Sequence, residues 1–253
     1  MVQSSLLRKT RGEASVVLTL YGVNVTSRTE AQHPRAPLRR ETIIAAAAQL
    51  VERDGLEALS MRKVAAVLGV EAMSLYHHIA GKDALLDGIV ELAVASMDLS
   101  DSQQGTWQER LKAIFRSYRA LAHSHPAVFP LVGRRPVQTL AALAPVDAAL
   151  GILREAGFSP REALTAFRTL SGFAYGYALA ELRGLAMESA AAQRGPTRSV
   201  LSAEAERFPH LAEVIPHAGA IDRDVEVEAA LDIIIAGLTS TLRSHGAAAD
   251  TAD

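Results

Sequence analysis

The sequence contains no cysteine, and this absence removes several classes of function at once. Disulfide bridges, thiolate metal sites and cysteine nucleophiles are all excluded. Long apolar runs are missing as well, because the stretch at residues 16–25 is far shorter than the ~20 residues of a membrane-spanning helix. We therefore expect a cytoplasmic protein that does not bind a membrane.

Motifs for catalysis and for cofactor binding are also absent. The chain has no glycine-rich phosphate loop, no Gly-x-Ser-x-Gly elbow and no His-x-x-x-His pair. His77 and His78 are adjacent, so on a helix they point in different directions, and no further ligand stands at a metal-binding spacing. We expect no enzyme, no cofactor and no metal site, with an all-α enzyme that carries an added DNA-binding motif as an alternative.

Charge is distributed unevenly along the chain, although the formal net charge is only −2. Residues 1–40 hold seven Lys or Arg against two Glu, and the rest of the chain is therefore acidic. A basic end on an acidic body is typical of proteins that meet nucleic acid with that end. We expect residues 1–38 to form a flexible basic extension that is a solvated tail without a role, and an arm that adds phosphate contacts or reaches a minor groove is the alternative.

Apolar residues recur at helical spacing almost throughout residues 39–246, with no strand pattern and no internal repeat. We predict an all-α fold with a three-helix DNA-binding domain at 39–84 and a larger ligand-binding and dimerisation domain at 85–246. Residues 247–253 are expected to be a disordered tail, and residues 189–202 a mobile loop. Helices are predicted at 39–54, 61–68, 71–78, 82–99, 107–123, 146–156, 160–187, 202–215 and 224–243.

Two short predicted helices, 61–68 and 71–78, have the spacing of a helix-turn-helix. Ala65 is small enough for two helices to cross closely, and Gly69, four residues later, permits the positive φ of a tight turn. The second helix is then the recognition helix, whose first turn enters the major groove of DNA. The side chains expected to contact DNA are Ser60, Arg62, Ala72, Met73, Ser74, Tyr76, His77 and Lys82.

These residues can play different parts on DNA. Ala72 and Met73 can touch thymine methyl groups, and Ser74 can bond a base edge or a phosphate. Tyr76 and Lys82 are expected at phosphates, with Lys82 at the positive end of the next helix. The set therefore combines few base readers with many positioning contacts.

Several segments of the sequence resemble a known family of proteins. The segment LSMRKVAAVLGVEAMSLYHHIAGKDALLDGIV resembles the DNA-binding domain of the TetR family of bacterial regulators. The segments GRRP, LREAGFSPREALTAF and GFAYGYALAELR resemble a C-terminal domain of the tetracycline-repressor type. The resemblance implies an all-α homodimer, an operator with inverted repeats and a small-molecule effector in the larger domain.

The sequence departs from the tetracycline-repressor pattern at functional positions. Ala72 and Met73 replace a base-reading glutamine and proline, so the operator sequence is expected to differ. Asp98, Leu131 and Gly172 align approximately with the histidines that hold drug and magnesium in that type. Tetracycline with magnesium is therefore not the expected effector.

The larger domain offers candidates for an effector site and for a dimer interface. Aromatic residues at helical spacing are by default core, but some of them can line a site between helices. The candidate effector-binding residues are Phe115, Tyr118, Phe129, Thr165, Arg168, Phe173 and Tyr177. The candidate interface residues are Gly172, Gly176, Ile234 and Leu238, which would form half of a four-helix bundle.

Together these features predict a ligand-responsive transcriptional regulator. We expect a repressor that a small, mostly apolar effector of unknown identity releases from double-stranded operator DNA. A ligand-independent DNA-binding scaffold is the second hypothesis, which differs in having a filled C-terminal core.

Overall fold

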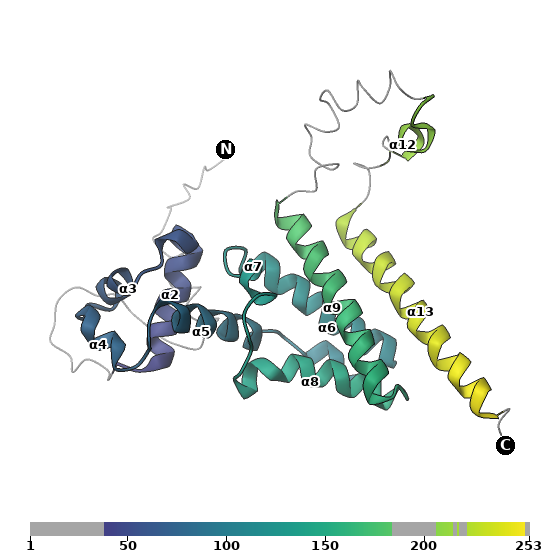
Figure 1. The fold of residues 1–253 in the computed structure, drawn as a ribbon, viewed down its shortest axis with the longest axis horizontal. Coiled ribbons are helices and arrows are strands. Elements are labelled where there is room, and N and C mark those ends of the chain that lie inside the picture. Colours follow the sequence, from purple (N-terminus) through teal and green to yellow (C-terminus); the bar gives the residue numbers. More distant parts are fainter. Residues whose placement is uncertain (1–37, 184–205, 215–216, 218–221, 251–253) are drawn as a thin grey trace, which may run out of the picture. The chain divides into compact units, whose positions relative to one another are not determined.

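The computed structural model describes residues 38–183, 206–214, 217 and 222–250. Every regular element in these ranges is a helix, which confirms the predicted all-α fold (Figure 1). The predicted extension up to residue 37 and the predicted loop at 189–202 lie outside the described residues.

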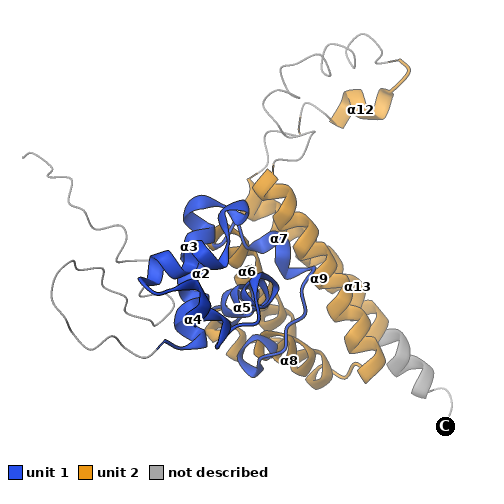
Figure 2. Cartoon of the chain, turned by 60° about the vertical axis from the view of Figure 1, so that its left-hand side comes forward, with its two compact units in different colours: residues 1–96, 125–143 blue, residues 97–124, 144–253 orange. Residues whose placement is uncertain are grey.

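The chain forms two compact units, which Figure 2 shows in two colours. Unit 1 comprises residues 1–96 and 125–143, and unit 2 comprises residues 97–124 and 144–253. This division differs from the predicted boundary after residue 84. It differs because all of the helix that begins at Lys82 packs with the DNA-binding helices, and because a later segment returns to the same unit.

Unit 1 is organised around two helices that bury most of their apolar side chains against each other. Ile43, Ala47 and Val51 are 0% exposed on the first, and Leu85 and Val90 are 0% exposed on the second. The helices of unit 1 are α2 (Arg40–Asp54), η1 (Leu56–Ala58), α3 (Met61–Leu68), α4 (Ala72–Tyr76), α5 (Lys82–Ala95) and α7 (Phe129–Val132).

The close approach of α2 and α5 depends on a glycine. A Cβ placed on Gly88 would lie 2.4 Å from Cδ1 and 2.8 Å from Cγ1 of Ile44. The absence of a side chain at Gly88 therefore lets α5 lie directly against the first helix of the DNA-binding motif.

Unit 2 has its own apolar core, to which helices from distant parts of the chain contribute. Leu111, Leu153, Leu170 and Leu231 are among its buried members, and the rings of Trp107 and Phe158 meet edge to face at 5.7 Å. The helices that contribute wholly or partly to unit 2 are η2 (Ser100–Gln103), α6 (Trp107–Ser124), α8 (Leu140–Glu155), α9 (Pro160–Arg183), α12 (Pro209–Val214) and α13 (Arg223–Asp250).

Several helix boundaries differ from the predicted ones. Helix α4 ends at Tyr76, because the next amides bond back to the carbonyl of Leu75 in a turn. Helix α8 begins before Pro145 and continues through it, so this proline breaks no helix although it lacks one hydrogen-bond donor. Helix α13 runs to Asp250, which makes most of the predicted disordered tail helical.

Candidate DNA-binding surface and effector domain

The turn of the helix-turn-helix has the local structure that its residues favour. The Oγ of Ser60 accepts a hydrogen bond from the amide of Lys63 at 3.3 Å and so caps α3. Gly69 ends α3 in the left-handed region at φ 66°, and the amide of Val70 bonds the carbonyl of Ala65 at 3.0 Å. This confirms the turn that Gly69 predicts.

Helix α4 is anchored by one residue and presents others to solvent. Leu75 is 0% exposed, whereas Met73 is 68% and Tyr76 is 48% exposed. Ala72 and Ser74 are half-buried. The predicted recognition helix thus keeps its apolar anchor inside and carries two large side chains outside.

The remaining predicted contact residues lie on neighbouring elements and are exposed. Arg62 lies in the first turn of α3, His77 follows α4, and Lys82 is the first residue of α5. Lys82 stands at the helix end where unpaired amides and the dipole favour anions. The structure therefore brings all eight predicted DNA contacts into one helix-turn-helix and the helix start that follows it.

Acidic side chains of α5 hold a segment that lies far along the chain. Nη1 of Arg135 donates to Oδ1 of Asp87 at 2.6 Å and to the carbonyl of Asp83 at 3.2 Å. Nη2 of Arg135 donates to Oδ1 of Asp83 at 3.0 Å. The segment after α7 is in this way attached to the first two turns of α5.

A third carboxylate of α5 completes this attachment. Oε1 of Glu91, a residue with 7% exposure, accepts hydrogen bonds from the amides of Gln138 and Thr139 at 3.0 and 3.2 Å. Its Oε2 lies 3.9 Å from the guanidinium of Arg40. Asp83, Asp87 and Glu91 stand four residues apart and share one side of the helix; we call these three residues the α5 clamp.

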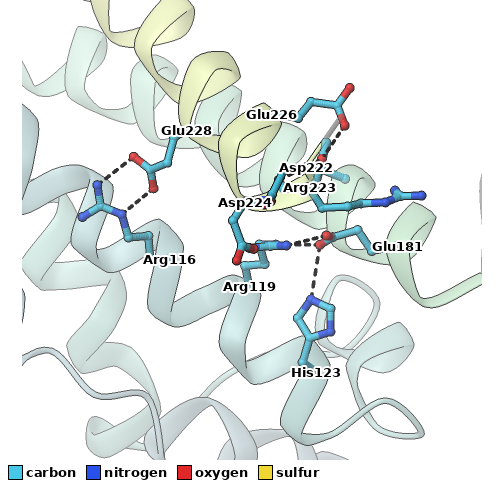
Figure 3. Close-up of polar contacts among 10 residues, drawn as sticks. Arg116, Arg119, His123, Glu181, Asp222, Arg223, Asp224, Glu226 and Glu228 are labelled. Atoms are coloured by element: carbon cyan, nitrogen blue, oxygen red, sulfur yellow. Dashed lines mark hydrogen bonds and ion pairs between the residues drawn. The ribbon is translucent and has the colours of Figure 1, made fainter. Parts of the chain in front are cut away.

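Unit 2 contains a second polar network, in which basic side chains of α6 meet acidic ones of α9 and α13 (Figure 3). Arg119 donates two hydrogen bonds to Glu181, at 2.6 and 2.7 Å, and a third to Asp224 at 2.6 Å. His123 lies 3.3 Å from the same Glu181 carboxylate. These four residues, which we call the α6 clasp, connect the end of α9 and the start of α13 to α6.

Two further ion pairs precede the clasp along α6. Arg116 makes a two-point contact with Glu228, with Nη2 at 2.7 Å from Oε2, and Lys112 pairs with Asp232. The hydrogen bonds from Arg116 hold the pKa of Glu228 below its ordinary value. Basic residues of α6 therefore face acidic residues of α13 over several turns.

Burial and charge act in opposite directions on Glu181. Its side chain is only 5% exposed, and burial alone would raise its pKa. The hydrogen bonds and charge of Arg119, helped by His123, outweigh burial and lower the pKa below its ordinary value. The carboxylate of Glu181 is thus ionised, and this buried charge is stabilised by the cation beside it.

Four of the predicted effector residues are aromatic side chains of unit 2. Phe115 is buried in the core of unit 2, and Tyr118 and Phe173 pack against that core. The rings of Phe173 and Tyr177 lie 5.7 Å apart, and the hydroxyl of Tyr177 donates to Glu226 at 2.9 Å. Burial raises the pKa of Tyr118 and of Tyr177, with Glu226 adding to it at Tyr177.

The other three predicted effector residues are two exposed side chains and one buried ring. Thr165 and Arg168 are exposed on α9, and the hydroxyl of Thr165 bonds the carbonyl of Arg161 within that helix. Phe129 is 0% exposed in the core of unit 1. The exposed side chains of Thr165 and Arg168 therefore lie outside the buried core of unit 2.

The predicted interface residues divide into two groups. Gly172 and Gly176 are exposed on α9, and a Cβ at either would meet nothing within 4 Å. Ile234 and Leu238 instead pack against the core of unit 2, and Val225 and Ile233, 64% and 75% exposed, are apolar residues that α13 presents to solvent.

The α5 clamp and the α6 clasp were not among the predicted features, although the sequence carries part of their signal. The four-residue spacing of Asp83, Asp87 and Glu91 marks an acidic side of α5, but a solvated surface has the same pattern. In the described ranges, no three His, Asp or Glu gather as metal ligands, and no helix is long and apolar enough to cross a bilayer.

Comparison with known protein families gives matches over both units. Residues 43–89 match the family model described as bacterial regulatory proteins, tetR family. Residues 99–242 match the model of the tetracyclin repressor-like C-terminal domain. The two matches cover the helix-turn-helix and most of the chain that follows it.

Individual proteins are similar over most of the chain. The HTH-type transcriptional repressor DrrR1 of Streptomyces coeruleorubidus is 31% identical over 175 residues, which span 69% of this chain and 65% of DrrR1. The class A tetracycline repressor from transposon 1721 of Escherichia coli is 34% identical and covered to 90%, over 79% of this chain.

Solved structures of the same kind share the fold. Apo ActR from Streptomyces coelicolor has a TM-score of 0.73 at 27% identity, over 84% of this chain and 99% of ActR. ActR in complex with actinorhodin has a TM-score of 0.73 at 26% identity, over 82% of this chain and 99% of that chain.

Proposed function

The chain belongs to the TetR family of bacterial regulatory proteins, and from that premise we propose that it is a repressor which a small effector releases from its operator. As a member of this family it is a ligand-responsive, DNA-binding transcriptional regulator. The form of the operator, the class of effector and the residues that bind each are parts of the proposal.

One observation carries the DNA-binding part of this proposal. Met73 and Tyr76 are held outward on α4 by the buried Leu75, and Arg62 and Lys82 are exposed on the adjoining helices. A short helix that presents such side chains suits the major groove, which is about 12 Å wide. The flanking charges suit the phosphates on either side of it.

The proposal includes a homodimer and therefore a symmetric operator. The exposed Gly172 and Gly176 on α9 and the exposed Ile233 on α13 support an interface of four helices, two from each copy. Two recognition helices related by a two-fold axis would contact half-sites about 34–36 Å apart, which predicts an inverted repeat.

The effector is proposed to bind in unit 2, close to Tyr118, Phe173 and Tyr177. These aromatic side chains are partly buried, so a mostly apolar molecule fits them better than a highly charged one. The ActR structure solved with actinorhodin supports a small-molecule effector for this chain. Binding that favours a conformation with the wrong half-site separation would lower operator affinity, and linkage makes the effect reciprocal.

The α5 clamp supports a role for α5 in this coupling. Lys82 begins the helix that Asp83, Asp87 and Glu91 attach to residues 135–139. A movement of that segment would therefore change the position of a proposed phosphate contact.

The DNA-binding part can be tested with Tyr76→Ala and Lys82→Ala in fluorescence-anisotropy titrations with operator DNA. We expect each variant to bind about tenfold more weakly, as is typical of a lost DNA contact. Both should remain dimers by light scattering, because neither residue is on α9 or α13. Arg207→Ala removes an exposed charge outside α9, α13 and the helix-turn-helix, and is the matched control, which should bind as the wild type does. Unchanged binding of Tyr76→Ala and Lys82→Ala would show that this surface does not bind operator DNA.

A ligand-independent scaffold would behave differently toward small molecules. An effector stabilises the folded state by RT ln(1 + [L]/Kd), so it raises the temperature of thermal unfolding. We expect some apolar compounds in a broad screen to do this and to release operator DNA. If no compound in the screen raises the unfolding temperature or releases operator DNA, the result would favour the ligand-independent scaffold.

A further inference from the structure

The recognition helix exposes one large side chain that is poorly suited to hydrogen bonding. Met73 is the second residue of α4 and is 68% exposed, the highest exposure among the large apolar side chains of the helix-turn-helix. Helix α4 contains no Arg, Lys, Asn or Gln. It therefore cannot make the bidentate hydrogen bonds that read guanine or adenine in the major groove.

From this exposure we infer that Met73 selects a pyrimidine that carries a 5-methyl group in each half-site. The inference rests on the proposed function, since it requires that α4 enters the groove. In the major groove thymine differs from the other bases by its C5-methyl group beside a carbonyl acceptor. A thioether side chain is apolar, unbranched and adaptable, so it can pack against that methyl group.

The same contact is unfavourable at other bases. An apolar side chain placed over an amino or carbonyl group removes water from it without replacing the hydrogen bond. Ala72 on the N-terminal side of Met73 is too short to replace that bond, and Ser74 is half-buried. The base pair opposite Met73 is thus selected by its methyl group and not by its hydrogen-bonding pattern.

Selection by a methyl group has a consequence that separates it from ordinary base reading. Thymine and 5-methylcytosine both carry the group, whereas deoxyuridine and cytosine lack it. Replacing one thymine by deoxyuridine removes only this methyl group and leaves every hydrogen-bonding atom in place. Burial of one methyl group corresponds to about a fourfold change in affinity, and two symmetric half-sites to about fifteenfold.

The experiment begins with an operator selected by the wild-type protein from a pool of random duplexes. Each thymine in turn is replaced by deoxyuridine, symmetrically in both half-sites, and affinity is measured by fluorescence anisotropy. We expect one symmetric pair of thymines whose replacement weakens wild-type binding by about fifteenfold. Met73→Leu should keep most of this sensitivity, and Met73→Ala should lose it at that pair alone.

A second arm uses cytosine at the same position. Wild-type binding should weaken with cytosine there and recover in part with 5-methylcytosine. Val67→Ala removes another exposed apolar side chain, 46% exposed on α3, and should leave the sensitivity of that thymine pair unchanged. This control separates Met73 from apolar exposure in general.

Other results would overturn the inference. Sequence-specific binding that is insensitive to deoxyuridine at every position would contradict it and leave the proposed function standing. Equal sensitivity of Met73→Ala and the wild type at every position would assign the methyl contact to another residue. Failure of the wild type to select any sequence would contradict both the inference and the proposed function.

Discussion

The two units use charge in opposite arrangements. In unit 1 the acidic side chains of α5 hold an arginine and two backbone amides, and in unit 2 the basic side chains of α6 hold carboxylates of α9 and α13. Each network contains one buried carboxylate, Glu91 in unit 1 and Glu181 in unit 2, among partners that are more exposed. We infer that the burial of a carboxylate, more than the number of ion pairs around it, decides how much its contacts contribute to the free energy of unfolding.

The partners of the two buried carboxylates differ. Glu91 accepts from amides whose positions the backbone fixes, whereas Glu181 depends on the long side chain of Arg119. Removal of Arg119 therefore leaves a buried charge beside His123 alone. Removal of Glu91 leaves two amides that lie close to solvent. We expect the larger effect in unit 2.

Among substitutions in the two networks, Arg119→Ala should have the largest effect on stability. We expect it to lower the free energy of unfolding by about 2–3 kcal/mol at pH 7, a value reduced from that of a fully buried pair because Arg119 lies near the surface. Thermal or chemical denaturation measures this directly. A loss no greater than that of a surface variant would contradict the importance of burial.

The same variant has a pH dependence with a definite sign. The pKa of Glu181 is lowered in the folded state, so its contribution to stability is present above the ordinary value of 4.5 and is lost as the pH falls through the lowered pKa. The difference in stability between wild type and Arg119→Ala should therefore be constant near neutral pH and narrow as the pH falls below 4.5. A difference that stays constant at low pH as well would mean that Arg119 acts by packing alone.

Glu91→Ala should have the second largest effect, about 1–2 kcal/mol, because the amides of Gln138 and Thr139 lose their acceptor. Hydrogen exchange at these two amides should accelerate before exchange elsewhere in unit 1. Operator affinity should also fall, since α5 carries Lys82. Glu57→Ala, an exposed carboxylate on η1, is the control, and equal effects of the two variants would remove the α5 clamp from the account.

Asp224→Ala should have the smallest effect on stability. It compares an exposed carboxylate with a buried one within the α6 clasp. Asp224 and Glu181 bind the same guanidinium, but the side chain of Asp224 is 81% exposed. We expect a loss below about 1 kcal/mol that decreases in high salt. A loss as large as that of Arg119→Ala would show that exposure does not govern these pairs.

The helix-turn-helix could be predicted because its determinants are local. Ala65 and Gly69 specify the crossing and the turn within five residues, and the structure confirms both the left-handed φ of Gly69 and the burial of Ala65. The start of α9 at Pro160 is local in the same way, because the fixed φ of proline suits the first helical position.

The two polar networks could not be predicted because their partners are distant. Arg135 lies 48 residues from Asp87, and Glu181 lies 62 residues from Arg119. Exposed charges and paired charges look alike in sequence, and only the fold decides which carboxylate becomes buried. The return of residues 125–143 to unit 1 could not be predicted for the same reason.

The most important part of the proposed function is the binding of a specific operator by the exposed residues of α3, α4 and the start of α5. Its most direct test is a fluorescence-anisotropy titration with the DNA that flanks the gene of this protein, at several salt concentrations, for the wild type, Arg62→Ala and Tyr76→Ala. We expect tight binding to an inverted repeat that weakens steeply with salt and is lost or strongly reduced in both variants. Weak binding that is equal for all sequences and unaffected by both substitutions would contradict it.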